Sequence, residues 1–178
     1  HNMGYRVVDE LGDRCGVGDW RREPPVDLRR LDLGVGVVAA KPLTYMNRSG
    51  TAMAWLLERF AVEPNDILVV VDDLDLSIGR LRLRRRGGPG THNGLRDICD
   101  IVGQGFPRLR VGVGGDTVPG DLAAWVTAPF EAHEQGAAER AAHRAADAVE
   151  AIVRDGFAAA MNLFNRIDAD DDDTSRES

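Results

Sequence analysis

The sequence predicts an α/β fold: one domain built on a mixed, mostly parallel, twisted sheet flanked by helices. Short apolar runs alternate with amphipathic and alanine-rich segments, and no repeat or linker divides the chain. A length of 178 residues is enough for one domain with a core, and 43% hydrophobic with 29% charged residues is typical of a folded protein. We therefore expect a single domain over residues 1–167 and an acidic, disordered tail over 168–178.

Five segments are expected in the first half of the chain. Apolar residues at helical spacing over residues 3–11 predict a short amphipathic helix, and two prolines within residues 21–27 predict a polar loop. The apolar run over residues 31–40 indicates a buried strand. Ser49 is the expected N-cap of a second helix, and residues 67–71 form a second continuous apolar run, which predicts another buried strand.

The second half of the chain continues the alternation of strands and helices. Residues 81–84 alternate leucine with arginine, which predicts a strand with one wet, basic face. Residues 132–155 are rich in alanine, with glutamates first and arginines later, and this composition predicts a long helix. The other expected elements are a glycine-rich loop at 87–94, a helix at 95–102, a strand at 108–113 and a final helix at 157–167.

The net charge of −7 is unevenly distributed. The tail from Asp168 to Ser178 has six acids and one arginine, a balance of −5, so residues 1–167 have only −2. Between Arg80 and Arg110, eight arginines face two aspartates, a local balance of +6. Such a cluster is typical of a surface that binds a polyanion, and the alternative is a solvated strand and loop.

Several classes of protein do not fit the composition. No apolar run approaches the roughly 20 residues needed to cross a bilayer, and no secretory leader opens the chain, so we expect a cytoplasmic protein without membrane contact. Cys15 and Cys99 are too few for a disulfide framework and lack metal-ligand spacing. They are interpreted as reduced core residues.

Three polar clusters follow predicted strands, at residues 44–47, 72–75 and 87–94, and a fourth is formed by His1 and Asn2. Each alone is more typical of a turn or a helix cap. Together they contain a histidine, a carboxylate that could orient it, and asparagine amides. Function in α/β sheets concentrates at the carboxyl ends of strands, so we expect one site there.

The residue types in these clusters favour activation of water. A histidine oriented by a carboxylate is a general base near neutral pH, and Asp72 could orient His1. Asn47 and Asn93 could bind a peptide-like or ester group without adding charge. The sequence has no G-x-S-x-G motif, and Cys15 is expected on a core face, so a covalent nucleophile has little support.

Five blocks of the sequence match the pattern of a known family: residues 1–4 (HNMG), 41–50 (KPLTYMNRSG), 72–76 (DDLDL), 91–96 (THNGLR) and 106–114 (FPRLRVGVG). Through these blocks the chain resembles the bacterial peptidyl-tRNA hydrolase family. The blocks fall in family order over nearly the whole chain, and this order is far more specific than any one block. The resemblance implies a mixed-sheet α/β fold and hydrolysis, without a metal or cofactor, of the ester between a peptide and the terminal ribose of tRNA, recycling tRNA from stalled translation.

The resemblance also implies roles for individual residues. His1 would deprotonate water, with Asp72 as its partner, so that these two form the catalytic pair. The residues implied to contact the rest of the peptidyl-tRNA are Asn47 and Asn93 at the peptide and ribose ends, Met46 along the channel, Tyr45 as a further substrate-binding residue, His92 near the reacting carbonyl, and Arg84 and Arg110 on a tRNA phosphate. The protein is expected to act as a monomer.

The sequence departs from the family pattern at some positions. The first strand and Gly-Asn-Pro-Gly turn that usually precede the histidine are not in this sequence, which fits an N-terminally incomplete chain. Pro89, Thr91 and the pair Gly115 and Asp116 replace residues more usual in the family, which affects the expected grip on the substrate more than water activation.

Two other functions are compatible with parts of the sequence. A non-catalytic RNA-binding relative, similar to plant organelle splicing factors, would share the fold and lack hydrolysis. Alternatively, Asp73 and Asp75 could bind Mg²⁺ or Mn²⁺ in a glycosyl or phosphoryl transferase, although no nucleotide-binding motif accompanies them.

Overall fold

The computed structural model describes residues 2–114, 130 and 132–166, and it has the α/β architecture with a mixed sheet that the sequence predicts. The expected tail at 168–178 lies outside the described residues. The elements in chain order are α1 (Met3–Cys15), β1 (Gly16–Glu23), β2 (Val26–Asp32), β3 (Gly36–Pro42), the 3₁₀ turn η1 (Met46–Arg48), α2 (Ser49–Phe60), the 3₁₀ turn η2 (Pro64–Asp66), β4 (Val69–Ser77), β5 (Leu81–Arg84), α3 (Asn93–Val102), β6 (Arg108–Gly114), α5 (Ala132–Asp155) and α6 (Phe157–Phe164).

The strands form two three-stranded sheets, ordered β1-β2-β3 and β4-β6-β5. Strand β4 runs parallel to β6, whereas the pairs β5·β6, β1·β2 and β2·β3 are antiparallel. The expectation of mostly parallel pairing was therefore wrong. Short connections between neighbouring strands, such as the one at Pro24 and Pro25, join antiparallel partners.

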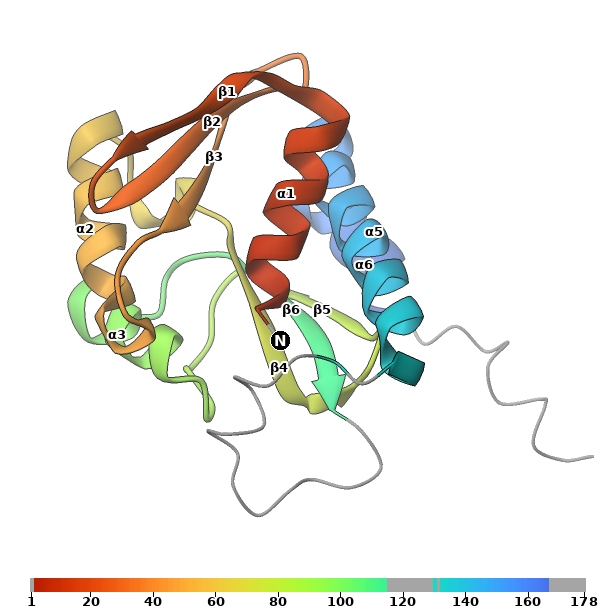
Figure 1. The fold of residues 1–178 in the computed structure, drawn as a ribbon. Coiled ribbons are helices and arrows are strands. Elements are labelled where there is room, and N and C mark those ends of the chain that lie inside the picture. The colour runs from red at the N-terminus through yellow and green to blue at the C-terminus, as the bar shows by residue number, and fades with distance from the viewer. Residues whose placement is uncertain (1, 115–129, 131, 167–178) are drawn as a thin grey trace, which may run out of the picture.

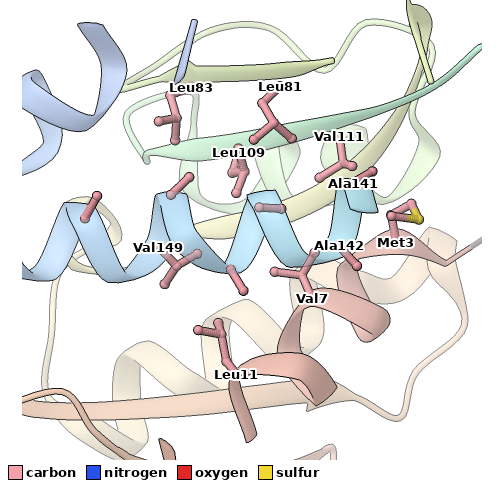
Figure 2. Packing of buried hydrophobic residues seen from close by; sticks show 14 of the residues in the cluster. Met3, Val7, Leu11, Leu81, Leu83, Leu109, Val111, Ala141, Ala142 and Val149 are labelled. Atoms are coloured by element: carbon pink, nitrogen blue, oxygen red, sulfur yellow. The ribbon is translucent and has the colours of Figure 1, made fainter. Parts of the chain in front are cut away.

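Helices cover both faces of the β4-β6-β5 sheet. Helices α1, α5 and α6 lie on one side, and α2 and α3 lie on the other (Figure 1). Figure 2 shows α5 between the sheet, with Leu109 and Val111, and α1, with Val7 and Leu11. The alanine-rich sequence of α5 lets the helix sit close to both neighbours, because its buried side chains are small. These buried alanines are Ala138, Ala141, Ala142, Ala145, Ala146, Ala148 and Ala151.

A second, smaller apolar cluster lies on the opposite face of the sheet. It joins Met53 of α2 and Leu95 and Ile98 of α3 to Val71 of β4 and to Phe106, which precedes β6. All five side chains are buried. This cluster sets α2 and α3 against the strands that contain the predicted site residues.

Several element boundaries differ from those predicted. Residues 21–27 are not a loop but the end of β1, a turn and the start of β2. Residues 31–40 are not one strand but the end of β2, a turn and most of β3. Gly34 has φ +78° in that turn, a conformation that favours glycine. Ser49 is the first residue of α2 rather than its N-cap, and its Oγ donates to the Met46 carbonyl at 2.7 Å.

The edge strand β5 has its free edge covered by one side chain. The Leu83 backbone N–H donates to Asn165 Oδ1 at 2.7 Å, and Asn165 Nδ2 donates to the Leu83 carbonyl at 3.0 Å. This pair of bonds replaces those of a neighbouring strand. None of the helices that the structure describes is both long and apolar enough to span a bilayer.

Candidate active site

Asp72 lies on β4, and the first turn of α1 packs against the same strand. A Cβ at Gly4 would lie 2.5 Å from the Val70 carbonyl oxygen, so only glycine permits this approach. The side chain of Asn2 caps α1 by accepting a backbone N–H of the first turn at 3.0 Å. The start of α1 is therefore fixed beside Val70, two residues before Asp72. The predicted base, His1, lies outside the described residues.

The Asp72 carboxyl and the His92 imidazole influence each other's ionisation. Burial raises the pKa of Asp72 above its usual range, and the His92 charge opposes that shift. Burial lowers the pKa of His92, while Asp72 acts in the opposite direction and Arg110 lowers it further. Arg110 donates both to Asp73 and to the Gly88 carbonyl, so the fold brings two of the three predicted polar clusters together at this point.

His92 also begins helix α3. It is the N-cap residue, and its Nδ1 accepts the backbone N–H of Leu95 at 3.1 Å. A neutral imidazole whose Nδ1 is an acceptor has its proton on Nε2. Because the pKa of His92 is lowered, the neutral form is favoured near neutral pH, and Nε2 is then a hydrogen-bond donor.

The segments with the two predicted asparagines abut one another. A Cβ added to Gly94 would lie 2.6 Å from Met46 Sδ and 3.0 Å from Ser49 Oγ, so the start of α3 touches η1. Asn47 in η1 and Asn93 at the start of α3 are both exposed and so accessible to a ligand. Asn93 Oδ1 accepts a bond from Arg96 at 3.3 Å, which leaves its amide N–H groups available to a ligand.

Apolar side chains surround η1 at the surface. Tyr45 is 81% exposed, Met46 47% and Leu43 42%, all in the segment that leads into α2. Large side chains exposed next to polar amides are typical of a surface that binds a chain with both peptide groups and apolar side chains. Tyr45 and Met46 are thus accessible, as their predicted role in substrate binding requires.

Four arginines share one face of β5 and β6. The antiparallel register pairs Arg82 with Arg110 and Arg84 with Arg108, and residues paired in this way project to the same side of a sheet. Arg82 and Arg84 on the edge strand are exposed, whereas Arg108 is 1% exposed. The basic face therefore has an exposed half and a buried half.

The two arginines predicted to bind a phosphate differ in their surroundings. Arg110 donates to Asp73 Oδ2 and to the Gly88 carbonyl, each at 3.0 Å, and its side chain is 13% exposed. Arg84 has no acidic partner among the residues that the structure describes. Arg84 is thus available to an anion directly, and Arg110 is already held beside a carboxylate.

The glycine-rich loop is held at its start by the arginines of β6. Arg108 stacks on the ring of Phe106 at 4.0 Å from its centroid and donates to backbone carbonyls. The accepting carbonyls are those of Gly87, Gly88, Gln104 and Phe106. Since the loop leads directly to His92 and Asn93, these bonds fix the approach of the chain to the site.

The carboxylate pair considered as a metal site has partners within the protein. Asp73 Oδ1 accepts the backbone N–H of Asp75 at 3.0 Å, and Asp73 Oδ2 accepts from Arg110. Within residues 2–114, 130 and 132–166, no group of three His, Cys, Asp or Glu side chains could hold a metal ion. Asp73 therefore fits the role of an ion-pair residue.

Neither the Asp73–Arg110 ion pair nor the hydrogen bond from the Gly50 backbone N–H to Asp97 Oδ2 at 2.6 Å was predicted from the sequence. The alternation from Arg108 to Val111 could have placed both arginines on one face, but the partner of each depends on strand register. Asp97 follows Asn93 by four positions and therefore lies on the same side of α3. That spacing was the available signal for the position of Asp97 near Asn93.

Comparison with known proteins agrees with this arrangement. The family model described as "Peptidyl-tRNA hydrolase" matches residues 1–172. A peptidyl-tRNA hydrolase of Chloroflexus aurantiacus is 43% identical over 168 residues, covering 93% of this chain and 89% of the relative. One from Roseiflexus castenholzii is 41% identical over 168 residues, covering 93% and 78%.

Solved structures show the same similarity in three dimensions. The crystal structure of peptidyl-tRNA hydrolase from Acinetobacter baumannii superposes with a TM-score of 0.84 at 32% identity, covering 93% of this chain and 85% of that one. The family match extends over the strands and loops that contain Asp72, Asn47 and Asn93. From this agreement it follows that the chain belongs to the peptidyl-tRNA hydrolase family.

Proposed function

We propose that this hydrolase cleaves the ester bond between a peptide and the terminal ribose of tRNA, releasing tRNA from peptides left by stalled translation. Family membership supports catalysis over RNA binding alone. The observation that carries the proposal is the meeting of three polar segments: Arg110 bonds both to Asp73, next to Asp72, and to the glycine-rich loop at Gly88, and Gly94, two residues after His92, contacts Met46 of η1. Ester hydrolysis needs an activated water and donors for the carbonyl at one place.

The proposed chemistry uses His1 as general base. Its imidazole takes a proton from water, the hydroxide bonds to the acyl carbon, and the bond from that carbon to the ribose oxygen breaks. The ribose oxygen then receives the proton, so atoms and charge balance. The Asp72 carboxylate orients the imidazole and stabilises its protonated form. The packing of Gly4 against β4 supports this pairing, because it fixes the start of α1 beside Val70, two residues before Asp72.

The remaining site residues are proposed to bind the two halves of the substrate. Asn47 and Asn93 bind the peptide and ribose ends, and Met46 and Tyr45 line the path of the peptide. The neutral His92 donates from Nε2 to the reacting carbonyl, a role that its Nδ1 bond to the backbone supports.

The tRNA body is proposed to bind at the basic face. Arg84 contacts a terminal phosphate first, and Arg110 adds a second guanidinium at the cost of weakening its bond to Asp73. We further propose that the protein works as a monomer in the cytoplasm, without a cofactor. Residues 1–167 are proposed to form the hydrolase domain.

The catalytic pair is tested by peptide release from peptidyl-tRNA. We expect His1→Ala and Asp72→Asn each to lower kcat by about 10²- to 10⁴-fold, the usual contribution of a general base and its partner. Binding of the uncleaved substrate should change little. Full turnover in His1→Ala would discard the mechanism, and tRNA binding without hydrolysis in the wild type would favour the non-catalytic function.

The phosphate contacts are tested separately by salt dependence. The double variant Arg84→Ala and Arg110→Ala should weaken tRNA binding. The steepness with which log affinity falls against log salt concentration should decrease by about one to two, because each lost phosphate contact removes about one from that slope. An unchanged slope would mean that these arginines are only solvated.

A further inference from the structure

Helix α2 begins without a capping side chain of its own. Its N-cap residue, Arg48, makes no side-chain hydrogen bond to the helix. Instead, the backbone N–H of Gly50 in the first turn donates to Asp97 Oδ2 at 2.6 Å. Asp97 belongs to α3, so a carboxylate from one helix satisfies an orphan N–H at the start of another. The negative charge also suits the positive end of the α2 dipole.

The position of Gly50 allows the two helices to touch at this point. A Cβ there would lie 2.5 Å from Ile101 Cδ1, 2.7 Å from the Asp97 carbonyl oxygen and 2.9 Å from Asp97 Oδ2. Two of these three atoms belong to Asp97, including a backbone atom of α3 that cannot move aside. The Asp97 hydrogen bond therefore exists only at a close, fixed separation of α2 from α3.

A second contact of the same kind lies one helical turn earlier in α3. Gly94 faces Met46 Sδ and Ser49 Oγ, at 2.6 and 3.0 Å from the position of an added Cβ. Ser49 in turn donates to the Met46 carbonyl, which joins η1 to the first turn of α2. The two glycine contacts and the Asp97 bond thus fix η1 and the start of α2 against α3.

These contacts flank the two asparagines of the site. Asn47 lies in η1, three residues before Gly50, and Asn93 lies next to Gly94 and one turn before Asp97. Neither asparagine is buried in the core. The distance between the two amides is therefore determined by how η1 and α2 are attached to α3.

We propose that Asp97 is a positioning residue for ester hydrolysis: by capping α2 from α3, it fixes the Asn47 amide relative to the Asn93 amide. The proposal rests on the proposed function, because Asn47 and Asn93 are the residues proposed there to bind the substrate. Asp97 itself is assigned no contact with the substrate. Loss of the bond lets η1 and α2 move away from α3, and displacement of a binding group by about 1 Å can reduce catalysis by as much as 10²-fold.

The experiment compares Asp97→Ala with Asp97→Asn in peptide release from peptidyl-tRNA. Asparagine keeps an acceptor oxygen and lacks the charge, so it should retain most of the activity. We expect Asp97→Ala to lower kcat/KM by about tenfold, within the range for a displaced binding group. The division of the loss between kcat and KM should match that of Asn47→Ala. Asp97→Ser, with a shorter acceptor, should fall between the two and replaces Asp97→Ala if that variant does not fold.

A matched control removes a similar bond far from the site. Asp66 Oδ2 accepts the backbone N–H of Glu63 at 3.0 Å in η2, at the other end of α2. Asp66→Ala should destabilise the protein modestly and leave kcat and KM unchanged. Equal kinetic losses in Asp66→Ala and Asp97→Ala would mean that Asp97 is only structural.

A double-mutant cycle separates failure of this proposal from failure of the proposed function. If Asp97 acts through Asn47, Asp97→Ala should have little further effect on kcat/KM in the Asn47→Ala background. Additive losses, or an Asp97→Ala variant as active as wild type, would overturn the role of Asp97 alone. A wild-type-like Asn47→Ala would instead overturn the proposed substrate site.

Discussion

The two faces of the β4-β6-β5 sheet are held to their helices in different ways. On the α5 side, Leu109 and Val111 are fully buried against alanines, and the contact is almost entirely apolar. On the α2–α3 side, the apolar cluster is smaller, and the helices also meet through Gly50, Gly94 and the carboxylate of Asp97. The residues proposed to bind the peptide and ribose ends belong to elements on this second side.

Because of this difference, the two sides of the sheet are expected to contribute differently to the stability of the fold and to the positions of the site residues. The free energy of apolar burial is proportional to area and tolerates small shifts of one helix against another. A hydrogen bond and a glycine contact hold only at one separation, so they fix positions more than they add stability. We infer that the α5 side supplies most of the folding free energy and that the α2–α3 side sets the spacing of the site.

The largest effect on stability is expected from Leu109→Ala on the α5 side. Leu109 is completely buried, and removal of a buried leucine side chain costs about 2–5 kcal/mol of unfolding free energy. Urea titration measures the loss. Activity per folded molecule should remain at the wild-type level, and a fall in that activity would remove the distinction between the two faces.

A smaller loss is expected from Arg108→Met, which retains an apolar side chain and removes the guanidinium. The Phe106 carbonyl, a buried group that now accepts from Arg108, would lose its donor, at about 1–3 kcal/mol, and the Gly87 carbonyl in the loop would lose one as well. Because the same loop leads to His92, kcat/KM should also fall. Arg108→Lys, which keeps a charged donor, is the control. If Arg108→Met lowered stability but left kcat/KM unchanged, the bonds from Arg108 to the glycine-rich loop would not be needed for catalysis.

The smallest effect is expected in the pH dependence of stability. Burial lowers the pKa of His92 below its ordinary value of 6.5. Well above pH 6.5 the imidazole is neutral in both the folded and the unfolded state. As the pH falls through 6.5, His92 binds a proton more readily in the unfolded chain than in the folded protein. The free energy of unfolding therefore decreases until the pH is below the pKa of His92 in the folded protein.

The matched variant for this effect is His92→Asn, which can still cap α3. Its free energy of unfolding should fall less than that of the wild type between about pH 7.5 and about pH 5.5, as measured by urea titration at each pH. An identical decrease in both proteins would show that His92 is not the responsible group.

Local signals in the sequence predicted much of the fold. The helix at 132–155 was predicted with its observed limits, because alanines, leading glutamates and a following glycine are all local features. The hairpin of β2 and β3 was missed because its apolar residues continue through the turn at Gly34. Strand β1 was missed because its side chains are mostly exposed, so its pairing with β2 left no apolar pattern.

For the candidate site, too, some features followed from local sequence signals and others did not. The cluster containing Asp72 was expected after its strand, but β4 continues to Ser77, with an irregularity in its pairing after Asp73. The contact between Met46 and Gly94 joins two clusters that are 48 positions apart in the sequence, and no local pattern predicted it. The bonds from Arg110 to Asp73 and from Gly50 to Asp97 join residues 37 and 47 positions apart. Such partners depend on register and helix packing, which sequence patterns do not contain.

The central claim is that the α5 side of the sheet supplies stability, whereas the α2–α3 side sets the spacing of the site. It is tested most directly by single-turnover peptide release from peptidyl-tRNA, measured on Leu109→Ala and Gly50→Ala under conditions where both are folded. We predict that Leu109→Ala cleaves at the wild-type rate, whereas Gly50→Ala, whose added methyl forces α2 away from Asp97, is slower by about tenfold. Equal rates in the two variants, or a slower rate in Leu109→Ala, would refute this claim.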